Sequence, residues 1–179
     1  MRVISGCARG HKLVSSEGTD TRPTSDRVKE SVFNIICPQI PDARVLDLFA
    51  GSAALGIEAL SRGAQSAVFV EKAPAAIKVI EKNLTDTRLA EKAEIKRCGY
   101  EEFLRKTDKI FDIVFVDPPY KSGFYATALS ILAERNIIAC GGIVVCEHEY
   151  DIAVPCVSGY KIYRERKYGR TCITLLIKE

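Results

Sequence analysis

The sequence predicts an α/β fold in which a mostly parallel sheet is covered by helices on both faces. Strand-like apolar runs alternate with helical patterns from residue 44 onward, which is typical of βαβ units. The last twenty residues contain two consecutive β-type runs, which predict a closing antiparallel hairpin. A length of 179 residues with 47% apolar content fits one domain with a substantial core.

Strands and helices can be assigned in order along the chain. We expect five strands, at residues 44–49, 66–71, 93–98, 111–117 and 142–147. We expect helices between them, at residues 53–62, 74–85, 101–105 and 122–134. Gly63 is suited to end the first of these helices, and Pro74 to begin the second. The hairpin pairs residues 160–167 with 171–178 across the turn Tyr168-Gly169-Arg170.

The first 43 residues differ in character from the rest. Residues 2–5 and 12–14 flank a glycine-containing segment and suggest a small β-hairpin. A helix capped by Thr24 or Ser25 then runs to about Cys37, before Pro38 and Pro41. Four apolar residues share one face of this helix: Val28, Val32, Ile35 and Ile36. This segment is too short for its own core, so we expect one domain over residues 1–179, with residues 1–43 as an appendage on a core of residues 44–179.

Composition excludes several classes of protein. No apolar run is long enough to span a membrane, and the N-terminus lacks the apolar region of a signal peptide, so we expect a cytoplasmic protein. The seven cysteines are an odd number with no CxxC pair, which argues against a disulfide framework or a metal site. Most lie in apolar runs, where we expect buried thiols.

The charge of the chain is concentrated at its two ends. The net charge is only +3. Residues 1–12 contain Arg2, Arg9 and Lys12 with no acidic residue, and residues 160–172 contain five basic residues against Glu165 alone. If the two ends meet on one face of the fold, that face would attract a polyanion.

The turn from the first strand to the first helix has the composition of a cofactor loop. Residues 47–56 read Asp-Leu-Phe-Ala-Gly-Ser-Ala-Ala-Leu-Gly, and small residues allow the backbone to turn sharply and approach a ligand. Glu71 ends the second strand, twenty residues after Gly51, where a carboxylate can accept both hydroxyl hydrogen bonds of a ribose. The pattern is close to the dinucleotide fingerprint, so a dinucleotide-dependent oxidoreductase is an alternative. Asp47 favours a cationic aminosulfonium ligand over a pyrophosphate.

The tetrapeptide Asp117-Pro118-Pro119-Tyr120 follows the fourth strand and should face the same crevice. The Asp117 carboxylate and the Pro118 carbonyl can accept the two N–H groups of an exocyclic amine, whose lone pair then points at a methyl group. Consecutive prolines fix the direction of that carbonyl. Tyr120 offers a face on which a flipped base can stack. The residues therefore indicate methyl transfer to a base amine, helped mainly by proximity and orientation.

These elements together resemble a known family. The cofactor loop and Asp117-Pro118-Pro119-Tyr120 are similar to class I methyltransferases with a [DN]-P-P-[YF] motif. The N-terminal pattern Arg2-Val3-Ile4-Ser5-Gly6, the run Thr21-Arg22-Pro23-Thr24 and the closing Tyr168-Gly169 resemble the bacterial small-subunit ribosomal RNA guanine-N2 methyltransferases of the RsmD type. The resemblance covers nearly the whole chain.

The resemblance implies a Rossmann-like class I fold with a seven-stranded sheet, S-adenosylmethionine as donor, and a guanine of 16S rRNA as acceptor, in the 30S subunit or an assembly intermediate. We expect a monomer without membrane contact. The resemblance assigns a catalytic role to four residues: Asp117, Pro118, Pro119 and Tyr120. The expected cofactor residues are Asp47, Phe49, Ala50, Gly51, Ser52, Glu71, Lys72, Gly99, Tyr100 and Asp117. The expected RNA-binding residues are Arg9, Lys12, Arg22 and Arg170.

The chain departs from the family pattern in two places. Ala53 stands where the family has glycine, and its methyl group could crowd the methionine end of the cofactor. Cys98-Gly99-Tyr100 stands where related enzymes place an acidic or amide side chain for the adenine, so backbone groups or Tyr100 must substitute. Two further alternatives stay open: an N6-adenine methyltransferase acting on DNA or RNA, and a non-catalytic RNA-binding assembly factor.

Overall fold

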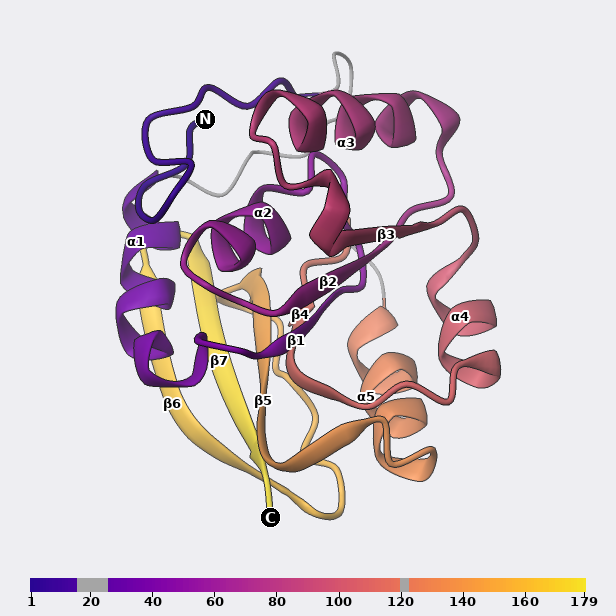
Figure 1. The fold of residues 1–179 in the computed structure, drawn as a ribbon. Helices are drawn as coiled ribbons and strands as arrows, with labels where there is room; N and C mark the ends of the chain where they lie inside the picture. Colours follow the sequence, from indigo (N-terminus) through magenta and orange to yellow (C-terminus); the bar gives the residue numbers. More distant parts are fainter. Residues whose placement is uncertain (16–25, 120–122) are drawn as a thin grey trace.

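The computed structural model describes residues 1–15, 26–119 and 123–179. Within these ranges the chain forms a seven-stranded sheet in the order β3-β2-β1-β4-β5-β7-β6 (Figure 1). The strands are β1 (Arg44–Asp47), β2 (Ser66–Val70), β3 (Ala93–Lys96), β4 (Phe111–Val116), β5 (Ile138–Glu149), β6 (Tyr160–Tyr168) and β7 (Thr171–Lys178). The first five run parallel, and β7 pairs antiparallel with both β5 and β6. The predicted sheet and its closing hairpin are confirmed.

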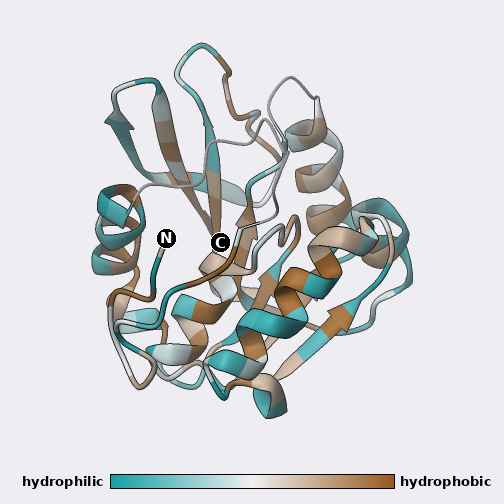
Figure 2. Ribbon diagram, turned by 90° about the horizontal axis from the view of Figure 1, so that it is seen from above, coloured by the Kyte–Doolittle hydropathy of each residue, from teal (hydrophilic) through white to brown (hydrophobic). Residues whose placement is uncertain are grey.

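Helices cover both faces of this sheet. They are α1 (Asp26–Ile35), α2 (Ala54–Ser61), α3 (Pro74–Asp86), α4 (Tyr100–Lys106) and α5 (Phe124–Glu134), with short 3₁₀ turns η1 (Cys37–Gln39) and η2 (Ala90–Lys92). Apolar residues of α1, α2 and α3 pack on one face, and those of α4 and α5 on the other. In Figure 2 brown residues mark the strands in the middle of the sheet, whereas the surrounding helices alternate brown and teal.

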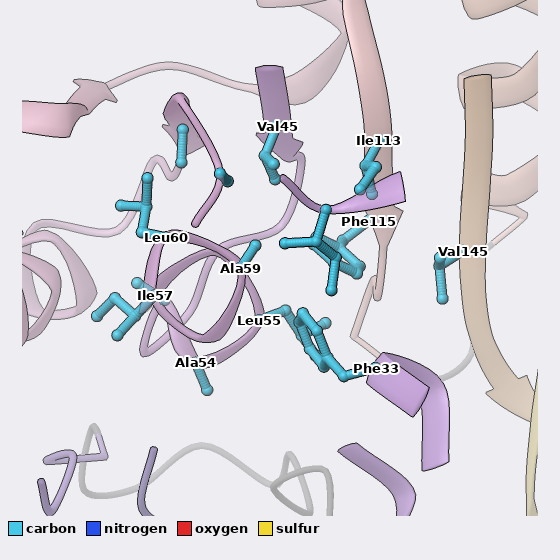
Figure 3. Close-up of a cluster of buried hydrophobic side chains, with 14 of the residues drawn as sticks. Phe33, Val45, Ala54, Leu55, Ile57, Ala59, Leu60, Ile113, Phe115 and Val145 are labelled. Atoms are coloured by element: carbon cyan, nitrogen blue, oxygen red, sulfur yellow. The ribbon is translucent and has the colours of Figure 1, made fainter. Parts of the chain in front are cut away.

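The core has two halves because successive side chains along each strand point to opposite faces of the sheet. Val45, Ile113, Phe115 and Val145 point to the α1–α3 face, where Phe33 of α1 lies 5.6 Å from the Phe115 ring (Figure 3). Their sequence neighbours on each strand point to the α4–α5 face. Because both faces are covered, the central strands are apolar on both sides, as the sequence predicts.

The ends of some strands and helices differ from the predicted ones, because contacts with residues distant in sequence determine where these elements begin and end. The strand expected at residues 142–147 begins at Ile138, because the chain pairs with Phe111 before the irregularity in the β4–β5 register. Helix α1 ends at Ile35, two residues early, and Pro38 lies inside η1 instead of ending the helix. The capping residues Thr24 and Ser25, and the expected helix start at Ser122, lie outside the described residues.

The N-terminal hairpin is shorter than predicted, with one bridge between Arg2 and Lys12. Its apolar residues Val3 and Leu13 join the core cluster of the α1–α3 face. The cysteine expectation was wrong in part. Only Cys146 and Cys172 are buried, while four are exposed: Cys7, Cys37, Cys140 and Cys156. Cys7, Cys37 and Cys156 lie outside the strands and α-helices, where no regular alternation turns a side chain toward the core.

No helix in the described ranges combines the length and hydropathy needed to cross a bilayer.

Candidate functional site

A cavity of about 710 Å³ lies at the carboxyl ends of the parallel strands. This volume is within the usual range for a small-ligand site. All ten residues predicted to bind the cofactor line it, and so do the catalytic candidates Pro118 and Pro119. Segments that follow β1, β2, β3 and β4 therefore converge on one space. Tyr120 and Arg22, which the sequence also assigned to the site, lie outside the described residues.

The loop after β1 is held by backbone contacts at its two ends. The Ala50 N–H donates to the Val70 carbonyl at 3.1 Å, and the Gly56 N–H donates to the Asp47 carboxylate at 3.0 Å. Gly51 adopts a left-handed backbone with φ of 53°, which glycine favours. An added Cβ at Gly56 would lie 2.2 Å from the Phe69 ring, so α2 can approach the sheet this closely only with glycine there.

Ala53 does not crowd the cavity, contrary to the expectation from sequence. It is fully buried and belongs to the core cluster of the α1–α3 face, and it is not among the residues that line the cavity. Its backbone is left-handed, with φ of 65°, which costs an L-residue about 1–2 kcal/mol. The family glycine thus suits the backbone conformation, while the methyl group here fills part of the core.

Glu71 orders the loops on both sides of the cavity. One carboxylate oxygen accepts the Gly51 N–H at 3.1 Å, and the other accepts the N–H groups of Lys72 and Ala73 at 2.8 and 2.9 Å. A carboxylate has about four acceptor positions. The structure therefore leaves about one position for a ribose hydroxyl, so receiving both hydroxyls requires the release of a backbone N–H.

Three aromatic rings form an apolar wall of the cavity. Phe49 lies 4.9 Å from Tyr100 and 5.7 Å from Phe124, measured between ring centroids. Phe124 is the first residue of α5 and was not predicted as a site residue, because the sequence around it carries no signal of a ligand site. Gly99 lies at the edge of this wall, and an added Cβ there would meet nothing within 4 Å. Such a wall can hold a purine ring by stacking, without the acidic side chain that the family uses.

Two aspartates in the cavity have raised pKa values. Burial raises the pKa of Asp47 to about 7, against the opposing hydrogen bond from Gly56. Burial also raises the pKa of Asp117 well above its ordinary value, and the neighbouring carboxylates of Glu147 and Asp47 raise it further. A nearby positive charge would favour the ionised form of both groups.

The N-terminal segment closes one side of the cavity through Met1 and Ser15. It is held by Glu58 of α2, whose carboxylate accepts the N–H groups of Ile4 and Ser5 at 2.8 and 3.0 Å. Asn83 of α3 bonds both Val14 and the Ser52 carbonyl, so it ties this segment to the cofactor loop. These anchors were not predicted from the sequence, although an acid and an amide within apolar helical patterns were an available signal.

The two basic ends lie on either side of α1. The Arg2 side chain pairs with Asp26 at the start of α1, and Tyr168 at the end of β6 hydrogen-bonds Ser31. In Figure 1 the N-terminal segment and the upper end of β6 both lie beside α1. The predicted RNA contacts Arg9, Lys12 and Arg170 are exposed and lie outside the cavity.

Comparison with known proteins identifies the family. The model described as conserved hypothetical protein 95 matches residues 1–177. The chain is 36% identical to ribosomal RNA small subunit methyltransferase D of Escherichia coli K12, over 100% of this chain and 90% of that protein. It is 40% identical to YlbH of Bacillus subtilis 168, provisionally named an rRNA methyltransferase, over 99% of each chain. The chain belongs to this family, the RsmD-type methyltransferases.

Solved structures agree with this assignment. The chain superimposes on yhhF of Escherichia coli, provisionally named a methyltransferase, with a TM-score of 0.88 at 36% identity, over 100% of this chain and 98% of that one. The predictions of the RsmD-type family, the Rossmann-like class I fold and an S-adenosylmethionine-dependent methyltransferase are confirmed. The family also sets aside the oxidoreductase alternative.

The residues of the cavity fit S-adenosylmethionine. Its described lining contains four acidic side chains, Asp47, Glu71, Glu101 and Asp117, against one basic side chain, that of Lys72. This charge suits a ligand with a sulfonium and an ammonium group and opposes a pyrophosphate. The aromatic wall suits the adenine, and the Glu71 carboxylate suits the ribose.

Proposed function

We propose that this RsmD-type methyltransferase transfers the methyl group of S-adenosylmethionine to the exocyclic N2 amine of a guanine in small-subunit rRNA. One observation carries the proposal: Asp117 and Pro118 line the same cavity as the Gly51 loop and Glu71. The groups that can hold an amine therefore adjoin the groups that can hold the methyl donor. Relatives named as small-subunit rRNA methyltransferases support the choice of RNA.

In this proposal the residues of the cavity orient the donor. When bound, S-adenosylmethionine supplies an electrophilic methyl group on a positively charged sulfur. The Glu71 carboxylate holds the ribose, and the backbone of Gly51 and Ser52 bounds the methionine end. Phe49 and Tyr100 hold the adenine by stacking. Asp47 in its ionised form stabilises the positive charge, because the Asp47 side chain is buried and water screens its charge poorly.

Asp117 and Pro118 orient the acceptor. The Asp117 carboxylate and the Pro118 carbonyl accept the two N–H groups of the guanine amine, and Tyr120 stacks on the base. The amine nitrogen would form its bond to the methyl carbon as the bond from that carbon to sulfur breaks, which leaves the neutral thioether S-adenosylhomocysteine, and the nitrogen would then give up one proton. The pKa of Asp117 is raised, which makes the Asp117 carboxylate a suitable acceptor for this proton. Orientation of the two reactants supplies most of the rate.

The appendage of residues 1–43 covers the donor and contributes to RNA binding in this proposal. Arg9, Lys12 and Arg170 contact phosphates on either side of α1, and Arg22 contributes a further positive charge to RNA binding. The substrate is a 30S particle or an assembly intermediate, in the cytoplasm, and the protein acts as a monomer. All of these assignments follow from the family resemblance and from the basic ends of the chain.

The test is transfer of labelled methyl to 30S particles and to naked 16S rRNA, both from a strain that lacks this protein. We expect one N2-methylguanosine by nucleoside mass spectrometry. Asp117→Ala should lower kcat at least about 10²-fold, with a donor Kd within about threefold of wild type by calorimetry. Asp108→Asn, at an exposed aspartate, is the matched control. Methylated adenosine, or RNA binding without any methyl incorporation, would contradict the proposal.

A further inference from the structure

A third acidic residue stands beside Asp117 at the carboxyl edge of the sheet. Strands β4 and β5 pair in parallel with Val116 opposite Cys146. The next residues, Asp117 and Glu147, are therefore side by side. Both point to the α1–α3 face, because they lie two residues beyond the pair Phe115 and Val145, which packs there.

Glu147 lies on the side of Asp117 that faces away from the donor cavity. It is not among the residues that line this cavity, and its residue exposure is only 5%. Its carboxylate is near enough to raise the pKa of Asp117. Because the donor cavity lies on one side of Asp117, we expect the acceptor base to approach Asp117 from the side of Glu147.

Glu147 is buried and Asp117 is half-buried, and the Glu147 carboxylate is close enough to raise the pKa of Asp117. Burial disfavours each charge, and the like charge of the partner adds to the cost. A glutamine at position 147 would fill the same space without this repulsion. Buried acids paired in this way at a ligand-binding edge are typical of functional sites.

We propose that Glu147 makes the acceptor site select guanine, by accepting the hydrogen bond of the guanine N1–H while Asp117 accepts one from the adjacent N2 amine. This inference rests on the proposed function and assigns the specificity of the same site. In guanine the N1–H and the N2 amine are adjacent donors, and two adjacent carboxylates are matched acceptors.

The same arrangement rejects adenine. Adenine also has an exocyclic amine, but its neighbouring N1 is an acceptor. Its lone pair would face the Glu147 carboxylate, with no proton between them, in a place where water cannot compensate. A site built to receive a hydrogen bond discriminates strongly against a ligand that lacks the donor. Asp117 and Pro118 alone suit either amine, so Glu147 separates the two candidate acceptors.

The test uses 2-aminopurine, which keeps the N2 amine but has no proton on N1. After the modified guanine is mapped, 16S rRNA is assembled by ligation around a synthetic oligonucleotide that carries guanine or 2-aminopurine at that position, and is reconstituted into 30S particles. Labelled methyl transfer gives kcat/KM for each base. We expect wild type to prefer guanine by about 10²-fold or more.

The key variant is Glu147→Gln, whose amide can also donate to an unprotonated N1. We expect it to lower the guanine preference at least about tenfold, with the donor Kd unchanged. Glu147→Asp, which keeps the acid, should retain a preference for guanine. Glu149→Gln is the matched control. Glu149 lies on the same strand and face as Glu147 but two residues further along β5, so this variant should keep the wild-type ratio of kcat/KM for guanine to that for 2-aminopurine.

The outcomes separate this inference from the proposed function. If wild type methylates guanine but Glu147→Gln keeps the full preference over 2-aminopurine, the role of Glu147 is refuted and the proposed function stands. A wild type that methylates both bases equally also refutes that role and leaves the proposed function standing. If wild type transfers no methyl to the guanine particle, the proposed function fails, and the role of Glu147 fails with it.

Discussion

The Lys29 ammonium and the Glu58 carboxylate form an ion pair, with 3.2 Å between Nζ and Oε2, although neither side chain is exposed to solvent. Lys29 also donates to the Arg2 carbonyl, and Glu58 accepts from Arg62 at 2.7 Å. Burial lowers the pKa of Lys29 even though Glu58 opposes the shift. This pair joins α1, α2 and the N-terminal segment.

Removing one partner of this pair should destabilise the protein strongly. We expect Lys29→Met to lower the free energy of unfolding by about 3–5 kcal/mol, because it removes the ammonium partner of the buried Glu58 charge. Urea unfolding measures the change. Lys78→Met, at an exposed lysine of α3, is the control and should stay within about 0.5 kcal/mol of wild type. A loss below about 1 kcal/mol for Lys29→Met would show that the pair is not a major anchor.

Asp47 should make the ligand-free protein less stable as pH rises. Its pKa is about 7 in the folded state against an ordinary value of 3.8, so between these pH values the folded state binds more protons than the unfolded state. Stability therefore falls across this window, by up to about 4 kcal/mol. Asp47→Asn should flatten the dependence of unfolding free energy on pH between 4 and 7. Equal slopes for the two proteins would refute the raised pKa.

Binding of the methyl donor should become tighter as pH rises through about 7. The positive donor favours the ionised form of Asp47, so binding releases a proton. Calorimetry in two buffers with different ionisation enthalpies measures this proton directly. Asp47→Asn should release less than wild type and bind more weakly at pH 8. A donor Kd that is independent of pH in wild type would be inconsistent with this role.

The close approach of α2 to the sheet should tolerate no side chain at residue 56. The Cβ of Gly56→Ala would meet the fully buried Phe69 ring, and overpacking of this kind costs about 1–3 kcal/mol. The better helix propensity of alanine offsets at most about 1 kcal/mol. Thermal unfolding without ligand checks the result. Gly99→Ala, where the added Cβ meets nothing, should be nearly neutral; similar losses in both variants would rule out the steric cause.

The exposed basic residues should contribute to RNA affinity through phosphates. Arg9→Ala combined with Lys12→Ala should weaken binding and lower the slope of log K against log salt by about 0.7–0.9 for each phosphate that is no longer neutralised. Arg170→Ala tests the other side of α1 in the same way. Filter binding at several salt concentrations gives both quantities, with Lys82→Ala on α3 as control. An unchanged slope would remove these residues from the interface.

Much of the fold follows from local patterns in the sequence. Alternating apolar runs and helical periods predicted the parallel sheet, and glycine and proline marked the loops after β1 and β4. Boundaries were less accurate where a remote partner decides them, as at Ile138, whose pairing with Phe111 extends β5. The missed contacts of Phe124, Lys29 and Asn83 have the same cause, because nothing next to these residues in sequence indicates their partners.

The sequence by itself determined which chemistry gathers at the carboxyl edge of the sheet: small residues for a cofactor loop, a carboxylate for a ribose, and an acid with two prolines for an amine. Local propensity and the parallel order of the strands suffice for that. Only the tertiary structure decided that Glu147 stands beside Asp117 and that Ala53 points into the core. Strand register and helix packing set these contacts, since they depend on how segments distant in sequence bury their apolar faces together.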